Sequence, residues 1–216
     1  MTKFKKHSIF IIVVLSAVFN LLIATDSIAI KYYTQGSTYL SKNSLDSALI
    51  SFTKAIALDT TYAAAYNNRG IVYYKKGGID QAIKEYNKSI ILNPKNARTY
   101  LNRGLAYNQK ALFDQAILDY TKAAELDTLY GKAYYNRGIA YHRKGTLDKA
   151  VIDYKKAIKL SPKDAKAMVE LAMIYEEKKD NQKAIFWYEK AWENKDFLND
   201  KGDSLVQNKL KELQKQ

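Results

Sequence analysis

The sequence contains no cysteine, and its 216 residues include only two prolines, two histidines and nine glycines. The lack of cysteine excludes disulfide scaffolds, cysteine-ligated zinc sites and thiol nucleophiles, and it leaves the redox state of the compartment undetermined. His7 lies in the first segment, and His142 has no second histidine beside it in the sequence. We therefore predict no catalytic residue, no metal site and no cofactor, and hence a protein that is not an enzyme.

The first segment has the pattern of an export signal. Lys3, Lys5 and Lys6 precede an apolar run from Ile9 to Ala24 that contains no charged residue. Basic residues ahead of such a run direct a chain into or across a membrane. We therefore expect the rest of the protein outside the cytosol, in the periplasm or cell envelope.

Two fates of this segment remain open. A helix over residues 8–25 would span about 27 Å, close to the roughly 30 Å of a bilayer's hydrocarbon core, so it could stay as a membrane tether. Ser27 and Ala29 provide the small residues that a signal peptidase requires, so it could also be cleaved. Residues 1–28 are thus predicted to be an export signal or a membrane anchor that forms an N-terminal hydrophobic helix.

The remainder of the chain repeats with a fixed period. Tyr-Asn-Asn-Arg-Gly at 66–70 recurs as Tyr-Leu-Asn-Arg-Gly at 100–104 and Tyr-Tyr-Asn-Arg-Gly at 134–138. A constant period of this length indicates a repeat architecture. One register divides the chain into five 34-residue repeats: 29–62, 63–96, 97–130, 131–164 and 165–198.

Each repeat shows helical periodicity twice. Tyr66, Gly70 and Tyr73 follow the spacing i, i+4, i+7, which places them on one helix face, and Ala82 and Tyr86 begin a second such series. Small residues allow two helices to approach closely while aromatic rings fill the space beside them. The pattern predicts an all-α fold of helix-turn-helix repeats.

These columns resemble the tetratricopeptide repeat family. The resemblance implies antiparallel helix pairs stacked into a right-handed α-solenoid with a concave groove. Between repeats, Asn93-Pro94 and Ser161-Pro162 are predicted to cap the next helix with proline in its first position. After residue 198 we expect a loop to Gly202 and a C-terminal cap helix from Ser204, within 199–216.

The resemblance also implies which side chains face the groove. Asparagine amides can both donate to and accept from a peptide backbone, and Arg98, Lys132 and Lys166 could form a basic edge for carboxylates. The alternative, that these asparagines are simply common in the family and the basic residues are solvated, stays open. The candidate groove residues are Tyr33, Asn68, Tyr74, Arg98, Asn102, Lys132, Tyr135, Asn136, His142 and Lys166.

The sequence therefore predicts a non-enzymatic protein-protein interaction scaffold of the cell envelope that binds a protein or peptide segment. The formal net charge of +13 supports an alternative, a basic peripheral module that binds anionic membrane or envelope polymer. Export argues against nucleic acid as the partner of this charge. The simplest interpretation of the same charge is that the lysines are solvated and confer only solubility.

Overall fold

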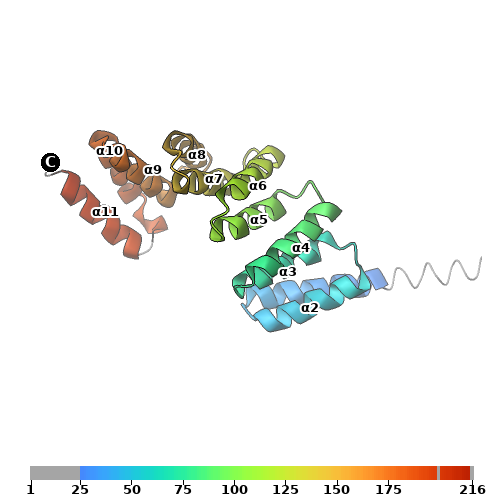
Figure 1. Ribbon diagram of the computed structural model, residues 1–216. Helices are drawn as coiled ribbons and strands as arrows, with labels where there is room; N and C mark the ends of the chain where they lie inside the picture. The colour runs from blue at the N-terminus through green and yellow to red at the C-terminus, as the bar shows by residue number, and fades with distance from the viewer. Residues whose placement is uncertain (1–24, 199, 215–216) are drawn as a thin grey trace, which may run out of the picture. The chain divides into compact units, whose positions relative to one another are not determined.

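The computed structural model describes residues 25–198 and 200–214, which form α-helices, one short 3-10 helix and turns, without a strand. The expected hydrophobic helix and all but Thr25 of the tether at 8–25 lie outside these residues. None of the described helices is long and apolar enough to cross a bilayer. The helices follow in chain order (Figure 1): residues 25–41, α2 (Leu45–Leu58), α3 (Ala63–Lys75), α4 (Ile79–Leu92), α5 (Ala97–Gln109), α6 (Phe113–Leu126), α7 (Gly131–Arg143), α8 (Leu147–Leu160), α9 (Ala165–Glu177), α10 (Asn181–Glu193), the 3-10 helix η1 (Lys195–Phe197) and α11 (Asp200–Leu213).

The helices belong to two compact units that divide after Pro94. In the N-terminal unit α3 packs on α2 and α4; in the C-terminal unit α5 to α11 pack each on the next. The first helices of the repeats begin at Ala63, Ala97, Gly131 and Ala165, the first residues of the expected repeats. The fold is therefore the all-α array of helix pairs that the periodicity predicts.

Buried rings from the second helices form the core of the repeats. Phe52, Tyr86, Tyr120, Tyr154 and Tyr188 are all at most 1% exposed. Each ring of the first four repeats lies against the glycine of its own first helix, and a Cβ built on Gly104 would stand 2.6 Å from the ring of Tyr120. Glycine is required there because the ring occupies the space where a side chain would begin.

A buried ion pair joins the two helices of three repeats. The arginine before each of these glycines reaches an acid sixteen residues further on, as Arg103 Nη2 does to Asp119 Oδ1 at 2.7 Å. Arg137 Nε donates to Asp153 Oδ2 at 2.7 Å, and Asp153 exposes only 3% of its side chain. Arg69 pairs with Glu85 in the same way, at 2.9 Å. These pairs join the first and second helix of a repeat at the same position in each of the three repeats.

The predicted helix caps between repeats are wrong. Asn93 and Ser161 end α4 and α8, and the next helices begin only at Ala97 and Ala165, beyond the prolines. The capping side chains are instead Asn96, which accepts from the amide of Arg98 at 3.1 Å, and Asp164. Short polar residues are suited to both ends of a helix. The dipeptides therefore indicate that a helix boundary is present, but not whether the residue ends one helix or begins the next.

The chain end also differs from its expected form. The loop expected up to Gly202 is helical, because α11 already begins at Asp200, and Ser204 lies inside it. Val206, which stands 34 residues after Ala172, is fully buried. Trp187 and Trp192 pack against the core cluster that contains Val206, in agreement with a packing role. Thus α11 occupies the place that the first helix of a sixth repeat would take.

Candidate functional site

One face of α9 carries the side chains that line two neighbouring hollows of the C-terminal unit. They follow the spacing i, i+3, i+4, i+7, i+10, i+11, which keeps them on a single side of a helix. Residues from α7 and α11 complete both hollows. We call this surface the inner face; its α9 residues are Lys166, Val169, Glu170, Met173, Glu176 and Glu177.

The larger hollow, which we call the Met173 hollow, has a volume of about 350 Å³. His142 of α7 and Leu205 and Lys209 of α11 form its other walls. Met173 and Leu205 are 38% and 37% exposed, so apolar surface is open to a ligand. An apolar floor of this kind suits aliphatic or aromatic side chains.

The charges around the Met173 hollow are paired with one another. Glu176 accepts from the Tyr188 hydroxyl at 3.0 Å and forms an ion pair with Lys209 at 2.5 Å. His142 Nε2 lies 3.0 Å from Glu177 Oε2. These contacts connect α7, α9, α10 and α11 and hold the walls of the hollow in place.

The smaller hollow, the Glu170 hollow, measures about 210 Å³, and Tyr135, Lys166, Val169, Leu198 and Gly202 surround the glutamate. Glu170 is half-buried and forms no ion pair with a described residue. Burial raises the pKa of the Glu170 carboxyl, an effect that the nearby positive groups of α7 and the Tyr154 hydroxyl oppose only in part. This acid is therefore kept in a poorly solvated place without a cation of its own.

Tyr154 lies beside the Glu170 hollow. Its ring centroid is 5.9 Å from that of Tyr135, and Glu170 contributes to the raised pKa of its hydroxyl, after burial as the main cause. The residue is fully buried, and its hydroxyl favours the ionised form of the Glu170 carboxyl beside it. Glu170 therefore has a neutral neighbour at this place and forms no ion pair with a described residue.

The sequence-predicted residues of the C-terminal unit lie at different places. Tyr135, His142 and Lys166 line the two hollows. Arg98 and Lys132 are exposed at the second positions of α5 and α7, and neither forms an ion pair with a described residue. The amide nitrogen of Asn136 donates to the carbonyl of Lys132 at 2.8 Å, so its own helix uses this donor. Asn102 is half-buried on α5.

The predicted residues of the N-terminal unit contact one another. Asn68 Nδ2 donates to the Tyr33 hydroxyl at 3.2 Å, and Asn67 Nδ2 donates to Asn68 Oδ1 at 3.0 Å. The Tyr33 ring lies 4.8 Å from that of Tyr62. Tyr74 is half-buried on α3, and burial raises its pKa. Asn68 and Tyr33 thus connect the helix over residues 25–41 to α3.

Two glutamates of the inner face, Glu170 and Glu177, were not predicted from the sequence to face the groove. Glu170 stands 34 residues after Asn136, in the column that holds Asn68 and Asn102 in earlier repeats. Glu176 and Glu177 follow on the same side of α9. The change from amide to carboxylate within a repeated column was the available sequence signal.

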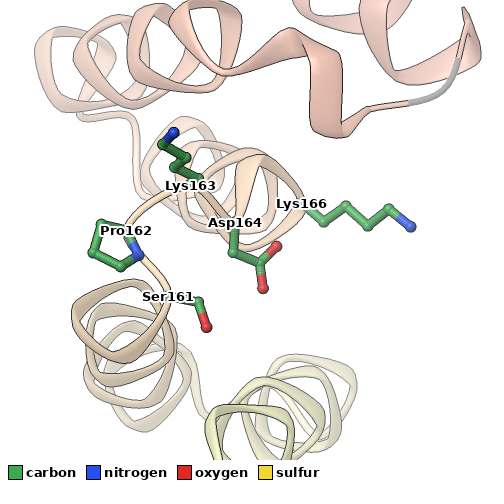
Figure 2. A pocket seen from close by; sticks show the side chains of 5 residues that line it. All are labelled: Ser161, Pro162, Lys163, Asp164 and Lys166. Atoms are coloured by element: carbon green, nitrogen blue, oxygen red, sulfur yellow. The ribbon is translucent and has the colours of Figure 1, made fainter.

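A third hollow lies at the loop between α8 and α9, with a volume of about 620 Å³ (Figure 2). Lys163 and Lys166 extend in different directions there. The carboxylate of Asp164 accepts from the amide of Ala167 at 3.2 Å and so caps α9. Because its charged groups do not converge, we consider this hollow a weaker candidate than the inner face.

The state of Glu170 gives a stability prediction. A raised pKa means that the folded chain holds this proton more tightly, so stability falls as pH rises from the unfolded pKa through the folded one. At pH 7, Glu170→Gln should therefore raise the melting temperature by a few degrees. The two proteins should converge in acid, where the wild-type carboxyl is protonated. Thermal melts across pH measure this, with Glu189→Gln on the exposed side of α10 as the neutral control; an unchanged or lowered melting temperature at pH 7 would contradict it.

Comparison with family models places tetratricopeptide repeats along most of the chain. A model described as TPR repeat matches residues 36–77 and 72–110, and models described as tetratricopeptide repeat match 97–128, 131–164 and 153–186. No curated protein sequence gives a significant match. The matched segments include every inner-face residue of α7 and α9.

Several solved structures have a similar fold. MamA is 27% identical, with 74% of this chain and 94% of that chain covered and a TM-score of 0.70. YrrB, described as a TPR protein with an unusual peptide-binding site, is 26% identical, with 84% and 92% covered and a TM-score of 0.68. PilF of Pseudomonas aeruginosa, at 20% identity, 88% and 93% coverage and a TM-score of 0.74, shows the fold alone.

Proposed function

The chain belongs to the tetratricopeptide repeat family, and from this premise we propose that it is a non-enzymatic scaffold that binds a segment of a partner protein on the inner face. Repeats of this kind support protein-protein interaction. The observation that carries the proposal is the pair of hollows that α7, α9 and α11 form along one side of α9. Adjacent side-chain-sized hollows on a rigid helical surface suit successive side chains of one bound segment.

Two further features support a protein segment as the ligand. Arg98, Lys132 and Lys166 stand at equivalent exposed positions of α5, α7 and α9, where helix N-termini add positive potential for carboxylates. YrrB, one of the similar structures, is itself described as having a peptide-binding site. We also propose the cell envelope as the location, on the evidence of Lys3 to Lys6 and the apolar run that follows them.

Site-specific photocrosslinking tests the surface. A photoreactive residue in place of Met173 should crosslink a partner in envelope fractions, because the side chain at this position opens into the Met173 hollow. The same residue in place of Ile152, which is 65% exposed on α8, should not crosslink that partner. Mass spectrometry of the crosslinked bands gives the comparison, and a partner captured only through position 152 would refute inner-face binding.

The contribution of Asn102 and Lys132 to binding can be tested once the partner has been identified. Asn102→Ala combined with Lys132→Ala should weaken its capture, since the pair removes an amide and a cation from the positions of α5 and α7 that correspond to Glu170 and Lys166 of the inner face. Gln115→Ala with Lys159→Ala is the matched control, because both residues are exposed on second helices. Affinity is measured by titration with the purified partner. Equal affinity of the first double variant and wild type would show that Asn102 and Lys132 do not belong to the site.

One observation favours the second candidate function, a basic module that holds an anionic membrane or polymer. Ile152 is exposed on α8 between Lys149, Lys155, Lys156 and Lys159, and none of these lysines forms an ion pair with a described residue. Binding through such a surface depends on screened charge. It should disappear between about 50 and 200 mM NaCl and after replacement of the lysines by glutamine, whereas inner-face binding should survive both.

A further inference from the structure

The Glu170 carboxylate beside its hollow lacks a cationic partner. It forms no ion pair with a described residue, and the neighbouring hydroxyl of the fully buried Tyr154 offsets the cost of burying its charge only in part. Both groups are near Tyr135, whose ring belongs to the lining of the hollow and is 5.9 Å from the Tyr154 ring. A carboxylate and an aromatic ring are two acceptors for a cation.

The chain's own cations leave the carboxylate unpaired. Lys166 is one turn before Glu170 on α9 and lines the same hollow, yet the two form no ion pair. His142 and Arg143 of α7 act on Glu170 only through their charge, and His142 already contacts Glu177. The raised pKa of Glu170 agrees with this incomplete compensation.

The column to which Glu170 belongs makes this residue distinct. Asn68, Asn102 and Asn136 occupy the equivalent places of the three preceding repeats, so an acid appears only in the last full repeat of this column. An amide at this place would avoid the cost of burying a charge. A carboxylate here is therefore better explained by a ligand than by packing.

We propose that the Glu170 hollow binds the basic side chain of a lysine or arginine in the partner segment. The aliphatic part of that side chain would lie along Val169 and Leu198, as the stems of these residues do on apolar surfaces. Its charged group donates to the Glu170 carboxylate, with the Tyr135 ring beside it. The inference rests on the proposed function, since it names the side chain that the inner face selects.

Selection from a random-sequence peptide library tests the proposal on the immobilised full chain. Wild type should enrich peptides with lysine or arginine at one fixed position. Glu170→Gln should lose this positional enrichment, and should bind the peptides selected on wild type about ten-fold or more weakly, as expected for a lost charge-assisted hydrogen bond. Glu189→Gln, exposed on α10, should behave as wild type.

The outcomes separate this inference from the function on which it rests. Peptides that compete with crosslinking at position 173 but show no basic preference, or the same preference on Glu170→Gln, would overturn the cation site and leave inner-face binding intact. A library without any enriched peptide would refute segment binding and the cation site together. Because glutamine relieves the burial of an acid, weaker binding by a variant with an undiminished melting temperature cannot be attributed to unfolding.

Discussion

Gly104→Val should lower the free energy of unfolding of the C-terminal unit by about 3 kcal/mol, the upper part of the usual range for overpacked cores. A Cβ at this position would stand 2.6 Å from Cε1 and 2.8 Å from Cδ1 of Tyr120, whose side chain is fully buried and cannot move away. The melting temperature should fall by roughly 6–12 °C. Circular dichroism during heating and urea titration measures the change.

Two controls assign this effect to the ring. Gly131→Val places a side chain at the start of α7, where the nearest atom to a Cβ is Ser161 Oγ at 3.5 Å, and should change stability much less. Gly104→Val combined with Tyr120→Leu should be more stable than the sum of the two single changes predicts, because the smaller side chain makes room. Equal losses for Gly104→Val and Gly131→Val would show that the close contact does not limit stability.

Asp153→Ala is expected to cost about 3–5 kcal/mol, the range for breaking one side of a buried ion pair. Asp153 accepts two hydrogen bonds from Arg137, whose side chain is only 18% exposed, so the change would leave a guanidinium poorly solvated and without its counter-charge. Urea unfolding of the variant, followed by circular dichroism, gives the loss directly.

A matched pair on the same helix controls for the removal of an acid. Asp148 on α8 forms an ion pair with Lys178 at 2.7 Å but is 88% exposed, so Asp148→Ala should cost less than about 1 kcal/mol. Replacing both members of the buried pair, Arg137→Met with Asp153→Leu, should recover most of the stability that Asp153→Ala loses. If the Asp148 and Asp153 variants were equally stable, burial would not explain the contribution of the Arg137–Asp153 pair to the free energy of unfolding.

The helices and their packing faces could be predicted because they follow from local spacing. Tyr66, Gly70 and Tyr73 share a face in any α-helix, and a small residue opposite a ring gives the core whatever the details of the turn. The helix caps could not be assigned, because Asn93 suits the end of α4 as well as the start of α5. The pairing of Arg103 with Asp119 depends on how the intervening turn sets two helices, which the pattern of either helix alone does not contain.

The candidate site was only partly predictable for the same reason. Tyr135, His142 and Lys166 were found from the repeat columns, and they do line the hollows. The hollows themselves need α7, α9 and α11 together, and α11 begins four residues earlier than its capping pattern suggested. Glu170 matters through what surrounds it, namely the buried hydroxyl of Tyr154 and the side chain of Lys166, which forms no ion pair with it. Neither neighbour can be read from the aligned repeat positions.

The buried valine of α11 limits what could be packed on this helix. At the equivalent place of the earlier repeats a glycine or alanine leaves room for the ring of a second helix, but Val206 fills that room with its own side chain. A helix with such a ring could therefore not be packed on α11 unless this position were first reduced to alanine or glycine.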